Sequence, residues 1–154
     1  LLNIIFAALL AGTSFGIWLG FNPSHYSAST YIEQQQNLVR SLNTLIVVLV
    51  VIATGLTLIS AYLQRRKKTA FILLLVAAAF LISCIFITRL GNVPIQSKML
   101  KWTVNTLPDN WTMLRDNWWS FHIWRTLVEL IAFMLIAWTT VQLRTTEANK
   151  SKLR

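Results

Sequence analysis

The sequence predicts an all-α membrane protein: an antiparallel bundle of four transmembrane helices, with a Trp-rich segment between the third and the fourth. Of the 154 residues, 55% are hydrophobic and 12% are charged, whereas about 25% are charged in a soluble domain. The 14 basic residues outnumber the 5 acidic ones. They gather between long apolar runs instead of covering a polar surface, which argues against nucleic acid. The expected partners are membrane lipids, with no nucleic acid.

Each apolar run is about as long as the roughly 20 residues that a helix needs to cross a bilayer. The first run ends in Gly-Phe-Asn-Pro without a clean cleavage site, so we expect a retained helix rather than a signal peptide. The second helix starts ahead of its apolar run, because a capping box extends from Thr30 to Glu33. We predict a single domain over residues 1-154, with helices at about 1-20, 30-63, 69-88 and 121-143.

The basic residues predict the orientation. The link from Gln64 to Lys68 allows only a tight hairpin, so the second and third helices are antiparallel neighbours. More basic residues lie on the side of this hairpin and the C-terminus than on the other side, and the positive-inside rule then places both termini in the cytoplasm of a multi-pass cell-membrane protein. The residues counted on the cytoplasmic side are Arg65, Arg66, Lys67, Lys68, Arg144, Lys150, Lys152 and Arg154.

The segment from Leu90 to Ser120 then faces the extracytoplasmic side. It and the start of the fourth helix carry most of the tryptophans, namely Trp102, Trp111, Trp118, Trp119 and Trp124. Because tryptophan gathers at membrane interfaces, we expect an aromatic belt, some of whose members also wall a pocket.

Polar side chains recur at helical spacing on two helices, although a charge at the bilayer centre costs about 2.5–3.5 kcal/mol. The second helix carries Glu33, Gln36, Arg40 and Asn43, and the fourth carries His122, Arg125 and Glu129. Both stripes fall at the extracytoplasmic end, which predicts a polar pocket in the outer half of the bundle. The alternative is that the charges only pair as structural clamps, Arg125 with Glu129 and Arg40 with Glu33.

The sequence does not identify a cofactor. The metal candidates are His122, which is otherwise a general base or a packed interfacial histidine, and His25 in the loop after the first helix. Iron, copper, a haem held by both histidines and no cofactor at all remain alternatives, because no Glu-x-x-His repeat or His-x-x-x-His pair occurs. The lone Cys84 leaves no Cys-x-x-Cys redox pair.

Gly12, Gly16 and Gly20 form a small-residue face on the first helix. Such a face favours close helix packing, either within one bundle or between two. The oligomeric state is therefore open.

Between the third and fourth helices the chain carries Asn92, Pro94 and Gln96 at alternate positions, followed by Trp118, His122 and Arg125. This pattern resembles the anthrone oxygenase-like family of small four-helix membrane proteins, which has Asn-x-Pro-x-Asn and Trp…His-x-x-Arg here. Gln96 departs from the family's second Asn. For some members the resemblance implies oxidation of an anthrone to an anthraquinone with dioxygen, while most bacterial members have no assigned substrate.

The resemblance implies an oxidoreductase or oxygenase acting on an apolar aromatic or quinone-like small molecule. We expect His122 to take a proton and Arg125 to stabilise the resulting oxyanion, with Glu129 as a third catalytic residue. The expected substrate-binding residues are Asn92, Gln96, Trp118, Glu33, Gln36 and Arg40. Two other functions stay open: a non-catalytic module that binds or transports lipid or small molecules, and a structural subunit of a membrane complex.

Overall fold

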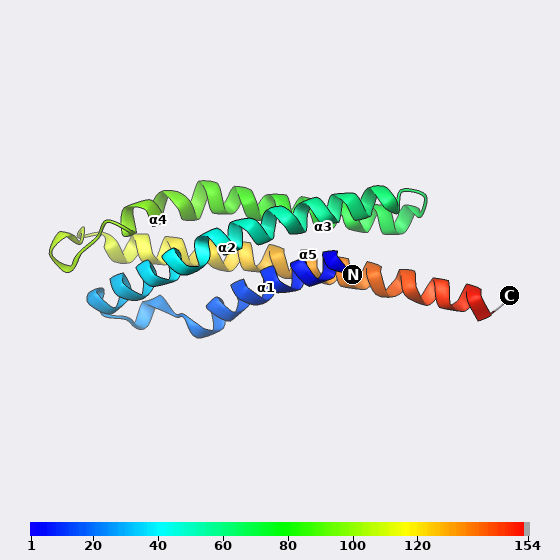
Figure 1. The fold of residues 1–154 in the computed structure, drawn as a ribbon. Helices are drawn as coiled ribbons and strands as arrows, with labels where there is room; N and C mark the ends of the chain where they lie inside the picture. Colours follow the sequence, from blue (N-terminus) through cyan, green and yellow to red (C-terminus); the bar gives the residue numbers. More distant parts are fainter. Residues whose placement is uncertain (153–154) are drawn as a thin grey trace.

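Four long helices lie side by side along the length of the computed structural model (Figure 1). They are α1 (Leu2–Gly20), α2 (Ala28–Leu63), α3 (Lys68–Ile87) and α5 (Trp111–Lys152). The shorter elements are η1 (Pro23–His25), the π-helical turn η2 (Thr88–Asn92), α4 (Val93–Met99) and η3 (Val104–Thr106). The structure describes residues 1–152, without the side chains of Arg144 and 146–152. Of the basic residues used for the orientation, the side chains of Arg144, Lys150 and Lys152 and the whole of Arg154 lie outside the described part.

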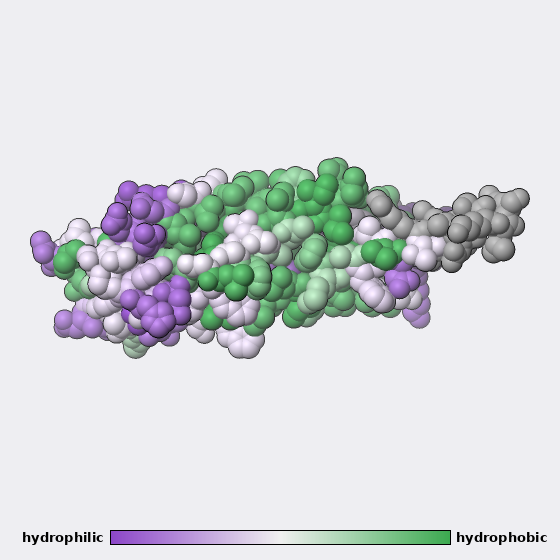
Figure 2. All heavy atoms as spheres, turned by 90° about the horizontal axis from the view of Figure 1, so that it is seen from below, coloured by the Kyte–Doolittle hydropathy of each residue, from purple (hydrophilic) through white to green (hydrophobic). Residues whose placement is uncertain are grey.

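The four predicted membrane helices are confirmed. Within the described residues, four helical segments are long and apolar enough to cross a membrane, and the chain is a multi-pass membrane protein. Figure 2 shows hydrophobic side chains over the middle of the molecule and hydrophilic ones toward its two ends. One end carries η1 and η3 and is called the aromatic end below; the other carries the α2–α3 turn and is called the hairpin end.

Small residues let the helices approach closely. The side chains of Ala53, Ala77 and Ala132, on α2, α3 and α5, are completely buried, as is typical of helix contacts in membranes. Near the hairpin end, the Thr57 hydroxyl donates a 2.9 Å hydrogen bond to Asn3 Oδ1 and so joins α2 to α1. The helices are therefore held by packing along their length and by a few buried hydrogen bonds.

Two helix starts differ from the sequence prediction. Helix α2 begins at Ala28, and Ser27 rather than Thr30 is its N-cap, with Ser27 Oγ accepting from the Thr30 N–H. Helix α5 begins at Trp111 instead of near residue 121. The reason is that its first turns are amphipathic rather than uniformly apolar, since Arg115 and Trp118 are buried while Asp116 is exposed.

The five tryptophans of the expected aromatic belt differ in their exposure. Trp102 and Trp118 are buried, and Trp111 and Trp119 are half-buried. Trp124 is 60% exposed and alone among these five fits a belt. The loop is drawn inward because Gln36 Nε2 on α2 donates hydrogen bonds to the carbonyls of Met99 (3.3 Å) and Trp102 (2.9 Å).

The small-residue face of α1 lies on the outside of the bundle. A Cβ added at Gly12, Gly16 or Gly20 would meet nothing within 4 Å, and all three glycines are exposed. The face is therefore not used for close packing within the described bundle.

Gly91 in η2 is different, because a Cβ there would lie 2.6 Å from Cγ of Phe121 on α5. We expect Gly91→Ala to lower the free energy of unfolding by about 1–3 kcal/mol, as overpacking does, measured by thermal unfolding in detergent. Gly55→Ala is the matched control: its Cβ would meet nothing within 4 Å, and alanine favours the helix. Equal stability of the two variants would contradict the tight contact at Gly91.

Candidate active site

Buried polar atoms without hydrogen-bond partners in the described residues come from four elements of the bundle, α1, α2, η2 and α5. They are Ser14 Oγ, Gln35 Nε2 and Oε1, Asn92 Oδ1, Trp118 Nε1, His122 Nε2 and Glu129 Oε2. Leaving one such group unpaired costs about 1–3 kcal/mol. A concentration of them therefore marks a place where the protein gives up stability for binding or chemistry.

His122 and Arg125 form the centre of this cluster on α5. The Arg125 guanidinium donates to His122 Nδ1 from Nε (3.2 Å) and from Nη2 (3.1 Å). Because Nδ1 accepts these bonds, the neutral imidazole carries its hydrogen on Nε2. In this geometry Nε2 carries the ring hydrogen and is available as a hydrogen-bond donor.

Two tryptophans fix the plane of the histidine. Trp118 lies parallel to the imidazole at a centroid distance of 5.5 Å and an interplanar angle of 6°, and Trp119 at 5.2 Å and 19°. Asn92 Nδ2 in turn donates a 3.0 Å hydrogen bond to the Trp118 carbonyl and so ties η2 to α5. His122, which is fully buried, is thus held by stacking and by the guanidinium.

Glu129 lies deeper on the same face of α5. The Cys84 thiol on α3 donates a 2.9 Å hydrogen bond to its Oε1, and Ser14 on α1 lies beside both Glu129 and His122. Within the described residues Arg125 and Glu129 form no ion pair, and neither do the exposed Arg40 and Glu33. Neither pair therefore makes the direct contact that the clamp alternative requires, although Arg125 lies near enough to Glu129 to interact with it electrostatically.

A pocket between α2 and the α3–η2–α4 segment leads to this cluster. Apolar residues of α2 form most of one wall, and polar groups at its inner end come from Asn92, Trp118 and Arg125. The space inside is about 30 Å³, enough for about one or two water molecules. One of the lining residues, Val47, is 46% exposed and lies in the part of α2 that is long and apolar enough to cross a membrane.

A polar contact spans this pocket. Gln96 Nε2 on α4 donates a 3.2 Å hydrogen bond to Asn43 Oδ1 on α2, and both residues line the pocket. A ligand larger than water must separate these helices or break this contact. Gln96, expected to bind substrate, therefore lies at the entrance.

The predicted stripe on α2 is only partly at the site. Glu33 and Arg40 are exposed and do not line the pocket, and Gln36 holds the loop carbonyls instead. The buried polar residue of α2 that the sequence analysis missed is Gln35, which does not line the pocket either but is 1% exposed with both amide atoms unpaired within the described residues. The available signal was its place in a buried row with Tyr31 and Val39, at spacings of four residues.

The two histidines lie in different environments. His25 is exposed in η1, whereas His122 is buried. In the part of the chain that the structure describes, no three His, Cys, Asp or Glu side chains are grouped as metal ligands. The described residues thus supply no ready three-ligand set around His122.

The four spanning helices define a multi-pass membrane protein with a buried polar cluster at the end of a pocket inside the bundle. Residues 36–135, more than half of the chain, match the family model described as anthrone oxygenase, and the chain belongs to that family. The matched region includes the pocket residues from Leu38 to Arg125, while Ser14 and Gln35 lie outside it. No curated protein and no solved structure matches the chain.

Proposed function

We propose that the protein is a membrane oxygenase that oxidises an apolar aromatic substrate bearing a phenol or enol group. The observation that carries this proposal is Arg125, whose side chain lies at the end of an apolar pocket, 7% exposed, with no acidic group within salt-bridge distance in the described residues. A buried charge without a directly paired counter-ion is costly. An anionic oxygen of the substrate would compensate it.

An oxidation that proceeds through a substrate anion is compatible with the positive charge of Arg125. The Arg125 guanidinium stabilises the phenolate or enolate, which raises the electron density on the reacting carbon. Dioxygen then oxidises that carbon from a methylene to a carbonyl, with one oxygen atom in the carbonyl and the other in water. Dioxygen and the substrate are both apolar enough to arrive through the lipid.

The other cluster residues serve this step in distinct ways. His122 acts as a positioning residue, because its Nδ1 holds the guanidinium. Asn92 Oδ1, Trp118 Nε1 and the Gln35 amide are available to bind substrate hydroxyl or carbonyl groups. We assign proton uptake to Glu129, since Oε2 is an unpaired carboxyl oxygen in the described cluster.

A transport module is the second candidate, and the distribution of buried polar groups disfavours it. Toward the hairpin end, the buried polar side chains of the described residues are Asn3, Thr54, Thr57 and Thr139, with no charged one. Transported solutes usually need polar groups through the whole membrane depth. For the cell membrane we propose cytoplasmic termini, because the basic α2–α3 turn lies at the hairpin end.

The test is oxygen consumption by the detergent-purified protein supplied with an anthrone. We expect uptake above the protein-free rate, one dioxygen consumed per anthraquinone formed, and ¹⁸O from labelled dioxygen in the product. Binding of the anthrone with oxygen uptake only at the protein-free rate would contradict the proposal and favour a binding module.

A further inference from the structure

A second groove lies at the hairpin end, between the start of α3 and the later part of α5. Its volume is about 290 Å³, and it is distinct from the pocket that leads to Arg125. The residues that line it are Lys67, Thr69, Ala70, Leu73, Trp138, Thr139, Gln142 and Leu143. The exposed lining surface is thus mainly apolar, and Lys67 and Thr69 lie at the α2–α3 turn.

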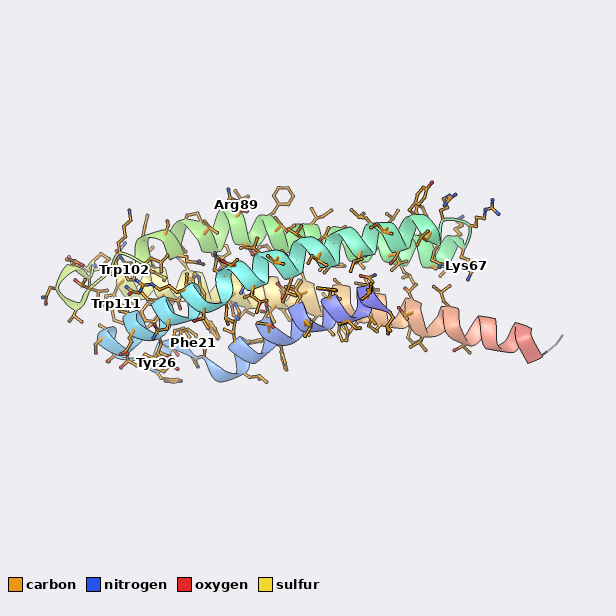
Figure 3. The ribbon with its side chains drawn as sticks, in the orientation of Figure 1. Phe21, Tyr26, Lys67, Arg89, Trp102 and Trp111 are labelled. Atoms are coloured by element: carbon orange, nitrogen blue, oxygen red, sulfur yellow. The ribbon has the colours of Figure 1, made fainter. Side chains whose placement is uncertain are left out.

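The turn beside the groove is strongly basic. Arg65, Arg66, Lys67 and Lys68 follow one another and are all exposed, and Figure 3 places Lys67 at the tip of the hairpin, next to α5. Arg65 is oriented by its own helix, since Nη1 donates to the Tyr62 carbonyl (3.0 Å) and the guanidinium lies 4.2 Å from the Tyr62 ring centroid.

An exposed aromatic residue on α5, Trp138, lines the same groove. The Trp138 side chain is 61% exposed. Tryptophan is enriched where lipid headgroups meet hydrocarbon, which is the level expected for a side chain near the end of a membrane helix. The groove therefore combines an apolar lining, an interfacial aromatic and a block of positive charge.

We propose that this groove binds an anionic phospholipid, with an acyl chain along Ala70 and Leu73 and the phosphate at Lys67 and Lys68. Basic pockets between membrane helices are the sites where acidic headgroups bind. The charge complementarity favours an anionic over a zwitterionic lipid, and the apolar lining favours a lipid over a free anion. This site is independent of the proposed oxygenase function.

The test is native mass spectrometry of the delipidated full chain titrated with phosphatidylglycerol or phosphatidylcholine. We expect phosphatidylglycerol to bind more tightly. The double variant Lys67→Gln/Lys68→Gln should weaken its binding about 25-fold, at about fivefold for each charge removed. The matched control Lys98→Gln/Lys101→Gln removes the same charge from exposed lysines at the aromatic end and should keep the wild-type affinity.

A variant that blocks the groove tests whether the lipid's acyl chain binds in it. Thr69→Trp fills the mouth at an exposed position and leaves the basic block intact, so we expect it to reduce phosphatidylglycerol binding. The proposal is overturned by equal affinity for the two lipids, by equal weakening in both double lysine variants, or by unchanged binding in Thr69→Trp. Competition by glycerol phosphate as effective as that by the intact lipid would also overturn it and would indicate a simple anion site.

Discussion

Arg125→Gln is expected to lower the rate of anthrone-dependent oxygen consumption by a factor of about 10²–10³, the usual cost of losing an oxyanion-stabilising group. Glutamine keeps a polar side chain of similar reach but removes the positive charge that balances the substrate anion. Oxygen-electrode rates of the purified variant and the wild type, at equal protein concentration, give the comparison directly.

The matched control is Arg89→Gln. Arg89 is also an arginine at membrane depth, but it is exposed and points away from the bundle (Figure 3). It does not line the pocket, so the variant should keep the wild-type rate. Full activity in Arg125→Gln would remove the guanidinium from the reaction.

His122→Ala is expected to cost on the order of 3 kcal/mol of unfolding free energy, because it combines a cavity with the loss of a partner for a buried charge. The ring removed is stacked on Trp118 and Trp119 and accepts both Arg125 hydrogen bonds. Denaturant unfolding in detergent, followed by tryptophan fluorescence, measures the effect.

The control for stability is His25→Ala, at an exposed position in η1. Its unfolding free energy should stay within about 0.5 kcal/mol of the wild type, as for most surface substitutions. Similar stability of the two alanine variants would show that the stack and the guanidinium contact contribute little.

The sequence predicted the spanning helices well because their signal is local. Apolar runs of sufficient length identify each span in isolation. The start of α5 could not be placed from hydropathy, because the turns from Trp111 to Ser120 mix buried and exposed polar residues. Their helical state depends on packing against α2, η2 and the loop, which is tertiary information.

The stripe on α5 was predicted correctly as one buried face, and the stripe on α2 was not. Periodicity shows that polar residues share a face but not which way that face points. Helix α2 has 36 residues, and at about 1.5 Å per residue it is longer than the bilayer core is thick. Polar residues ahead of its apolar run, such as Glu33 and Arg40, can therefore be exposed outside the hydrocarbon core, and Gln35 occupies the interior instead.

The contact partners of the site residues could not be predicted from the sequence. Glu129 meets Cys84, which is 45 residues away, and His122 meets Arg125 through Nδ1 rather than through an acid. These contacts depend on side-chain rotamers and on the rotation of each helix about its axis. Residue spacing on a single helix constrains neither of them.

The most direct test of how His122 acts compares the oxygen-uptake rate of His122→Asn with that of His122→Ala, below the unfolding temperature of both. Asparagine places Oδ1 near the position of the imidazole Nδ1, so it can still accept from Arg125, but it cannot act as a base. If His122 positions the guanidinium, His122→Asn keeps a rate within about tenfold of the wild type, whereas His122→Ala falls by about a hundredfold, as for a lost oxyanion donor. Equal inactivity of the two variants would contradict the positioning role and assign proton transfer to the imidazole.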